Sequence, residues 1–369
     1  MNNDSFTPQR RQFLGAMMAL AGWGQLATAT AAGSGSIPSQ QHHRLLLNTG
    51  FSGPVAFFLL AQDKGYFRNA GLTVELASGP GAAAMVPLVR EGAYDVGYGD
   101  ISALIERIAN SAPDTGPVAI YTTFNVNPFT IAVAADGPIR RPQDLIGRRV
   151  TGHASDAALL TFDLYADAAN IVANRVHVDR SMGSMGSAVK DMLDGRGADG
   201  VFGFVNTLIA SAAPFGVSPS QLRFLNWSDV LPEMYGNTLF VTREAHQRDL
   251  ERGAPDAGTG LAGLVRAVNR GLMDTIKSPS LAMESLSRHA PGSDIGVNLR
   301  RLQGTLAMEM AHPEGARLGI GEMDDQRLAK LIQRIVKVKR LPRTPSVREV
   351  FDRRYLPPVS ERIFSLARQ

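Results

Sequence analysis

Short apolar segments alternate with helical segments along the first two thirds of this 369-residue chain, and this alternation limits the folds that it can adopt. "RLLLNTG" (44–50) predicts a buried strand that ends at a glycine. "PVAFFLLAQDKGYFRNAG" (54–71) predicts a helix, and "LTVELAS" (72–78) predicts the next strand. Strands and helices in this order favour a mostly parallel sheet with helices on both faces.

The pattern repeats further along the chain. "IAVAADGPI" (131–139) and "ADGVFGFV" (198–205) predict strands, and "SDAALLTFDLYADAAN" (155–170) predicts a helix between them. From about residue 256 the sequence predicts mostly helices. We therefore expect two α/β units and a helical C-terminal region.

The N-terminal segment has the features of an export signal. "RRQFL" (10–14) precedes a short apolar run (16–21), and small residues follow it. This order predicts a signal peptide of the twin-arginine type over 1–32 and a linker over 33–43, which includes two histidines. A disordered basic tail is the alternative.

Composition excludes several classes of site. The net charge of +4 is spread over 38 basic and 34 acidic residues, and no long basic run with interleaved aromatic residues predicts nucleic-acid binding. The chain has no cysteine, which excludes disulfides, thiolate catalysis, cysteine metal sites and a lipid-bearing cysteine. No histidine and carboxylate spacing typical of a metal site occurs. We expect a free exported protein without a cofactor or metal.

Three segments resemble a known family. They are "GPVAFFLLAQDKGYFRNAGLTVEL" (53–76), "VPLVREGAYDVGYGD" (86–100) and "PQDLIGRRVTGHASDAALLTFDLYADAANI" (142–171). In this order they resemble the periplasmic substrate-binding proteins of ABC importers. The branch handles nitrate, sulfonates, taurine and thiamine-pyrimidine precursors. The resemblance covers about residues 44 to 245.

The resemblance implies a type II periplasmic binding fold. It is an α/β fold with two lobes, each a mostly parallel sheet with helices on both faces, joined by two crossover hinges near 125–129 and 237–241. Lobe one would comprise 44–126 plus 240–369, and lobe two 127–239. Ligand would lie in the cleft between the lobes of a monomer, and the membrane partners would be an ABC permease and its ATPase.

Four glycine-rich segments follow predicted strands, at 50–53, 79–81, 97–100 and 152–155. A strand that ends in glycine before a helix exposes backbone N–H groups, which bind anionic or polar groups. Each segment could equally be only a turn. The ligand-binding residues predicted in these segments are Phe51, Ser52, Gly53, Gly79, Gly81, Gly99, Asp100, His153 and Ser155.

Aromatic and amide side chains at strand ends complete the predicted site. Tyr98 stands between two glycines after a strand, and we predict it as the main ligand contact. Tyr235 is a second aromatic candidate. Asn125, Asn206 and Asn237 each follow a predicted strand, where a turn role is the alternative.

These features predict a solute receptor rather than an enzyme, because paired catalytic groups and cysteine are missing from the sequence. A sensor subunit that presents ligand to a membrane receptor is an alternative that the sequence does not separate from transport. An enzyme of the pyrimidine-synthesis type on the same fold is less favoured. Few arginines or lysines lie at the predicted strand ends. We therefore expect an uncharged or singly charged organic ligand with a flat portion.

Overall fold

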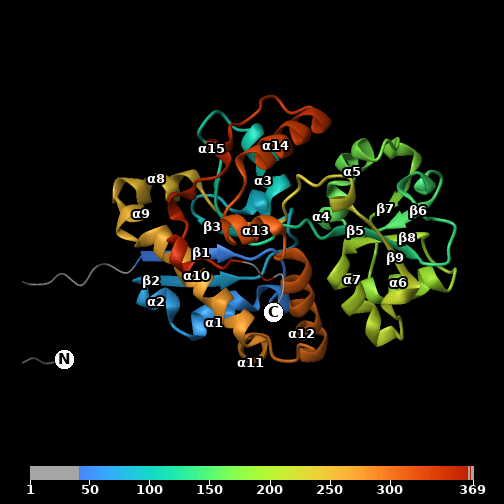
Figure 1. The fold of residues 1–369 in the computed structure, drawn as a ribbon, viewed down its shortest axis with the longest axis horizontal. Helices are drawn as coiled ribbons and strands as arrows, with labels where there is room; N and C mark the ends of the chain where they lie inside the picture. The colour runs from blue at the N-terminus through green and yellow to red at the C-terminus, as the bar shows by residue number, and fades with distance from the viewer. Residues whose placement is uncertain (1–40, 365, 367–369) are drawn as a thin grey trace, which may run out of the picture. The chain divides into compact units, whose positions relative to one another are not determined.

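The computed structural model describes residues 41–364 and 366, which contain two five-stranded sheets (Figure 1). The first sheet has the strand order β2-β1-β3-β10-β4. Its strands are β1 (Gln41–Leu46), β2 (Leu72–Ala77), β3 (Val96–Asp100), β4 (Val118–Thr122) and β10 (Asn237–Val241). Only β10 is reversed, because it is antiparallel to both of its neighbours while β2, β1 and β3 are parallel.

The second sheet repeats this arrangement in the order β7-β6-β8-β5-β9. Its strands are β5 (Phe129–Ala134), β6 (Arg149–Thr151), β7 (His177–Asp179), β8 (Gly200–Phe204) and β9 (Leu222–Asn226). Here β5 is the reversed strand. The predicted α/β fold with two mostly parallel sheets is confirmed.

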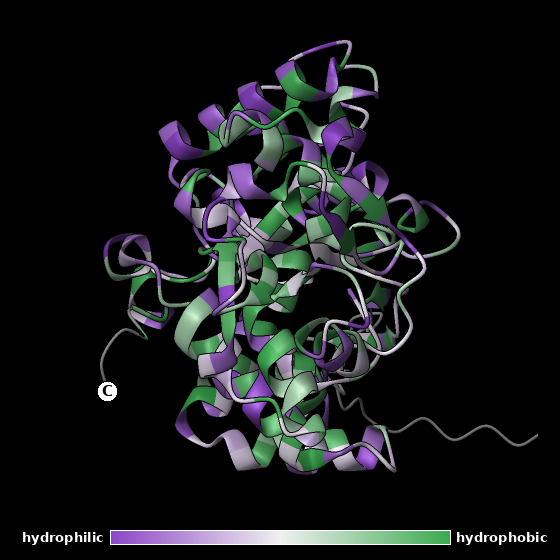
Figure 2. Cartoon of the chain, turned by 90° about the vertical axis from the view of Figure 1, so that its right-hand side faces the viewer, coloured by the Kyte–Doolittle hydropathy of each residue, from purple (hydrophilic) through white to green (hydrophobic). Residues whose placement is uncertain are grey.

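Alternating side chains bury both faces of each sheet. Leu45 of β1 and Leu47 just after it pack into the apolar cluster that contains Phe58, whereas Leu46 packs into the cluster that contains Leu104. The period of two in a strand explains this division. Figure 2 shows hydrophobic residues along the inner strands and hydrophilic residues on the outer faces of the helices.

Helices cover both faces of each sheet. In the first lobe they are α1 (Ala56–Asp63), α2 (Tyr66–Asn69), α3 (Ile101–Ala109), α8 (Arg243–Glu251), α9 (Ala254–Ala257), α10 (Gly260–Lys277), α11 (Pro279–His289), α12 (Ile295–Gly304), α13 (Pro313–Leu318), α14 (Asp325–Lys339) and α15 (Val347–Val350). In the second lobe they are α4 (Ala157–Leu160), α5 (Phe162–Ala168), α6 (Met185–Leu193) and α7 (Val205–Ala212). Figure 1 shows α4 and α5 on one side of the second sheet and α6 and α7 on the other.

Two connections join the sheets. The chain leaves the first sheet after Thr122 and enters the second at Phe129, and it returns between Asn226 and Asn237. The predicted second hinge at 237–241 is therefore strand β10, and residues 227–236 make the return instead. The limits of the two lobes otherwise stay a prediction.

The first strand begins earlier than the sequence predicts. β1 starts at Gln41, so the end of the predicted linker (33–43) belongs to the first sheet. His43 is buried, and its Nδ1 atom contacts the carboxylate of Asp95, which also accepts a hydrogen bond from the backbone N–H of Arg44. The predicted signal peptide lies outside the described residues.

Helices of the C-terminal region touch both lobes. α12 packs against α7 of the second lobe, and α14 packs against α3 of the first lobe and α5 of the second. Lys339 at the end of α14 forms ion pairs with Glu106 of α3 at 3.0 Å and with Asp163 of α5 at 3.2 Å. Within the described residues, no helix is long and apolar enough to span a membrane.

Candidate functional site

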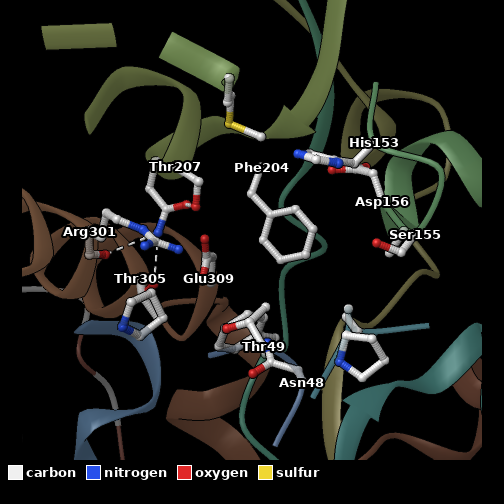
Figure 3. A pocket seen from close by; sticks show the side chains of 18 residues that line it. Asn48, Thr49, His153, Ser155, Asp156, Phe204, Thr207, Arg301, Thr305 and Glu309 are labelled. Atoms are coloured by element: carbon white, nitrogen blue, oxygen red, sulfur yellow. Dashed lines mark hydrogen bonds between the residues drawn. The ribbon is translucent and has the colours of Figure 1, made fainter. Parts of the chain in front are cut away.

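A cavity of about 340 Å³ lies where the carboxyl ends of strands from both sheets meet (Figure 3). The first lobe contributes Asn48 and Thr49 after β1, and the segment 80–82 after β2. The second lobe contributes residues between β6 and α4 and at the junction of β8 with α7. Open α/β sheets commonly bind ligands at such strand ends.

Apolar side chains form part of the cavity wall. Figure 3 shows Phe204 between two sets of polar side chains, one around Arg301 and the other around His153. Phe124, Met185, Pro54 and Pro80 also line the cavity. Aromatic rings and methionine make favourable contacts with a flat ring, so this part of the wall suits the flat portion of an organic molecule.

Arg301 of α12 brings a positive charge to one end of the cavity. Its buried Nε atom has no hydrogen-bond partner among residues 41–364 and 366. Desolvation lowers the pKa of Arg301, and the Coulombic attraction of Glu309 acts in the opposite direction. Arginine stays protonated in proteins, so this guanidinium is a cation, and the nearby Glu309 is the acidic residue whose charge acts on it. The side chain as a whole is half-buried, and pairing with an anion would satisfy its buried Nε atom.

Glu309 lies at the same end of the cavity, on the π-helical turn η8 (Thr305–Glu309) that continues α12. Glu309 is 1% exposed, and neither of its carboxylate oxygens has a hydrogen-bond partner within the described chain. Desolvation raises the pKa of Glu309 to about 8, although Arg301 and the nearby Thr305 hydroxyl favour the charged form. The carboxyl group is therefore mostly protonated at neutral pH and can donate a hydrogen bond.

The backbone of this turn is held by both lobes. Asn206 Nδ2 of the second lobe donates hydrogen bonds to the Arg301 carbonyl at 3.1 Å and to the Thr305 hydroxyl at 2.7 Å. The backbone N–H of Val126, between the two sheets, donates to the Glu309 carbonyl at 3.0 Å. π-Helical turns are rare and occur frequently at functional sites. This one connects the cavity wall with the hinge and with the second lobe.

His153, Ser155 and Asp156 form the other polar group in the cavity wall (Figure 3). Asp156 caps α4, and its Oδ1 atom accepts hydrogen bonds from two backbone N–H groups. Although the residue is only half-buried, loss of water around its carboxylate raises the pKa of Asp156 to about 6. A Cβ atom on Gly81 would lie 2.8 Å from the Ser155 carbonyl, so this glycine lets the two lobes approach closely.

A family model described as NMT1/THI5 like matches residues 53–282, which is more than half of the chain. The chain belongs to the NMT1/THI5-like family. The family predicted from the three sequence segments is thereby confirmed. No curated protein matches the chain.

Solved structures share the fold of this NMT1/THI5-like protein. The periplasmic aliphatic sulphonate binding protein SsuA from Escherichia coli has a TM-score of 0.62 and 15% identity, over 85% of this chain and 92% of that chain. The alkanesulfonate-binding protein SsuA from Xanthomonas axonopodis pv. citri, bound to MOPS, has a TM-score of 0.59 and 14% identity, over 85% and 98%. These proteins are substrate-binding proteins, which agrees with the predicted class.

An enzyme has the same fold. A cysteine-to-serine mutant of DSZB in complex with biphenyl-2-sulfinic acid has a TM-score of 0.57 and 13% identity, over 86% of this chain and 98% of that chain. DSZB is a desulfurization enzyme. The fold alone therefore does not separate a receptor from an enzyme.

Four of the predicted ligand-binding residues line the cavity. Gly81, His153 and Ser155 come from two of the four glycine-rich segments, and Asn206 follows β8. They come from both lobes, as the fold class implies. Their contact with a ligand stays a prediction.

Tyr98 does not line the cavity, and this is a correction of the main predicted ligand contact. Tyr98 is fully buried within β3, which lies at the centre of the first sheet. Its ring packs against Phe57, Phe58 and Phe124, and its hydroxyl is hydrogen-bonded to Thr123 at 2.6 Å. The glycines beside it admit neighbouring side chains rather than a ligand.

The segment of Phe51, Ser52 and Gly53 supports α12 instead of lining the cavity. Gly53 N–H donates to the Asn298 Oδ1 atom at 2.8 Å, and a Cβ atom on Gly53 would lie 2.0 Å from the Asn298 carbonyl. Ser52 is the N-cap residue of the short turn η1 (Gly53–Val55), and Phe51 packs edge-on against the ring of His289. This segment therefore positions the helix that carries Arg301.

Three other predicted residues in the glycine-rich segments have structural roles, because two allow close approach of the backbone and one caps a helix. A Cβ atom on Gly79 would lie 1.9 Å from the Leu47 carbonyl, and one on Gly99 would lie 2.5 Å from the Ala82 carbonyl. Asp100 caps α3 through a 3.0 Å hydrogen bond from the Ala103 N–H, and burial raises the pKa of Asp100 to about 7. None of the three lines the cavity among the residues that the structure describes.

The remaining predicted residues lie at or beside the hinge. Asn125 is fully buried in the first connection, and Asn237 is fully buried in β10. Tyr235 lies in the second connection, where its ring stacks under Arg327 and its hydroxyl donates to Glu314 at 2.5 Å. Their positions favour a role in the hinge rather than in direct ligand contact.

Replacing Tyr98 with phenylalanine is expected to distinguish a structural role of Tyr98 in the core from direct contact with the ligand. Loss of the hydrogen bond to Thr123 should cost about 1 kcal/mol of unfolding free energy. Ligand affinity should change by less than about twofold, because the hydroxyl does not reach the cavity. Chemical denaturation and calorimetric titration of the same variant measure both effects. A loss of affinity larger than about tenfold would return Tyr98 to the ligand site.

Sequence reasoning missed Arg301 and Glu309. Arg301 is one of two adjacent arginines in a helical segment, and the sequence does not indicate which one faces the cavity. The close packing of Gly304 against Asn206, where an added Cβ atom would lie 2.6 Å away, is the contact that orients this helix toward the second lobe.

Proposed function

We propose that the protein is an extracytoplasmic solute receptor that binds a small organic anion between its two lobes and delivers it to an ABC importer. The NMT1/THI5-like family and the fold shared with periplasmic binding proteins support this function. The predicted export signal agrees with a periplasmic location. Such a receptor would act as a monomer on a permease and ATPase in the membrane.

One observation carries the choice of an anion, namely the guanidinium of Arg301 in the cavity wall. It has no hydrogen-bond partner on its buried Nε atom within the described residues, and its neighbour Glu309 is mostly neutral at pH 7. A charge-assisted pair with a carboxylate or sulfonate would satisfy it. The sequence-based expectation is an uncharged or singly charged ligand, and this cation favours the singly charged alternative.

The apolar wall favours an anion that carries a flat or short apolar group. Phe204 lies beside the polar groups in Figure 3, and Phe124 and Met185 line the same cavity. Pockets of this kind bind organic ligands through apolar contacts and fix their orientation through a few polar groups. Aryl and alkyl sulfonates are candidates, because sulfonate-binding proteins share the fold.

Calorimetric titration with a panel of ligands tests the proposal. Benzenesulfonate, benzoate, taurine, nitrate and a neutral aminopyrimidine differ in charge and in flat surface. We expect organic monoanions to bind more tightly than the neutral pyrimidine and than nitrate, which lacks an apolar group. Tightest binding by the neutral molecule, or no binding by any of the five, would contradict the proposal.

We further infer that the protein binds its ligand without converting it. The chain has no cysteine, whereas the DSZB structure described above is a cysteine-to-serine mutant of an enzyme. No group of three metal-binding side chains occurs among the described residues. Incubating the purified protein with a bound ligand and analysing the mixture by mass spectrometry should return the ligand unchanged, and a new product would favour an enzyme.

A further inference from the structure

The end of the cavity near Arg301 contains a second unsatisfied group. Glu309 is 1% exposed and lines the cavity, and neither of its oxygens has a hydrogen-bond partner within the described chain. Figure 3 shows its carboxyl group beside Arg301 and Thr305. A buried ionised carboxylate without hydrogen bonds costs much more free energy than a neutral acid in the same place.

We propose that Glu309 acts as a neutral carboxylic acid that donates a hydrogen bond to the bound anion, so that capture of the ligand is linked to a proton on this residue. This inference rests on the proposed function, because it assigns a second contact to the same ligand. In the ionised form, the Glu309 carboxylate would pair with Arg301 and repel an anion. In the neutral form it leaves Arg301 to the ligand and adds a donor.

The proton comes from solvent and is held on a Glu309 oxygen. When an anion binds, its oxygen accepts the hydrogen bond from this O–H, and no covalent bond to carbon forms or breaks. The bound anion favours the protonated form still further, because it repels the carboxylate. Above the pKa of Glu309 in the free protein, each binding event must therefore take up about one proton.

Other titratable groups near Glu309 do not change charge in the same way. Arg301 of α12 stays charged, and burial raises the pKa of Tyr98 on β3, which therefore stays neutral. Asp156, on the second lobe, has a pKa of about 6 and is ionised above neutral pH. His153 also lines the cavity and needs a separate control. On its other side Glu309 borders a smaller hollow with the uncharged side chains of Asn127, Asn226 and Ser228.

The linkage of folding and anion binding to the proton on Glu309 has a defined sign and pH range. Burial raises the pKa of Glu309 to about 8, so the folded protein binds more protons than the unfolded chain between about pH 4.5 and 8. In the ligand-free folded protein, Glu309 loses its proton between pH 7 and pH 9, and binding must then take up a proton. Affinity for an anion should therefore fall by about tenfold over this range. A fixed positive charge alone would give no such fall.

Titration of benzenesulfonate, which stays a monoanion throughout this range, tests the inference. Wild-type protein should bind about tenfold more weakly at pH 9 than at pH 7. The variant Glu309→Gln donates from an amide at every pH, so its affinity should not change across this range. His153→Gln should keep the wild-type difference. The same pH dependence in wild type and Glu309→Gln would overturn the proposal.

A measurement without ligand decides the inference even if benzenesulfonate fails to bind. From pH 6 to pH 8, the denaturation midpoint of wild type should fall relative to that of Glu309→Gln, because the folded protein retains a proton on Glu309 that the unfolded chain has released. Parallel midpoints would overturn the inference. Binding that depends on Arg301 but not on pH would refute the role of Glu309 and leave the proposed receptor function intact.

Discussion

Replacing Arg301 with methionine is expected to weaken binding of an organic anion by about a hundredfold or more, which corresponds to about 2.7 kcal/mol. Methionine keeps much of the length of the side chain but removes the charge and its hydrogen bonds. Charge-assisted hydrogen bonds in a desolvated site account for a loss of this size. Calorimetric titration of wild type and Arg301→Met measures it.

The chain offers a matched control one residue away. Arg300 lies on the same helix but is exposed, and it does not line the cavity among the described residues. Arg300→Met should leave the affinity within about twofold of wild type. Equal losses from the two substitutions would indicate long-range attraction by the whole surface rather than a contact at Arg301.

Replacing Arg327 with alanine is expected to lower the free energy of unfolding by about 3–5 kcal/mol. Its guanidinium forms an ion pair with Glu314 at 2.6 Å and donates to the carbonyls of Asn125 and Met234, both at 2.7 Å. These carbonyls belong to the two connections between the lobes, so one side chain of α14 holds both. Removing it would leave the Glu314 carboxylate buried without its cation.

Chemical denaturation of Arg327→Ala and Arg317→Ala tests this role. Arg317 also pairs with an acid, Asp324 at 2.7 Å, but its side chain is 61% exposed. Exposed ion pairs contribute less than about 1 kcal/mol, so Arg317→Ala should unfold close to wild type. A loss from Arg327→Ala no larger than that of the control would show that the hinge does not depend on this residue.

Strand ends could be predicted from the sequence because their signals are local. Glycine after an apolar run marked the places where Gly81, His153 and Ser155 enter the cavity wall. The same signal misled at Tyr98. There "VGYGD" is itself a strand between two neighbours, and its glycines make room for Met85 and Phe240. A local pattern does not indicate whether a strand is central or at an edge.

The contribution of the C-terminal helices could not be predicted from local patterns. α12 reaches the cavity because it packs on Gly53 of the first lobe and on Asn206 of the second, residues far away in the sequence. Its π-helical turn then directs both Thr305 and Glu309 into the cavity wall. These contacts depend on the whole fold, whereas helix periodicity depends only on nearby residues.

Native mass spectrometry of protein purified from its native cells tests the central claim most directly, by comparing wild type with Arg301→Met. We predict that wild type carries a small organic molecule with one acidic group and that Arg301→Met does not retain it. A bound molecule without an acidic group, or the same molecule retained equally by both proteins, would contradict an anion receptor built around Arg301.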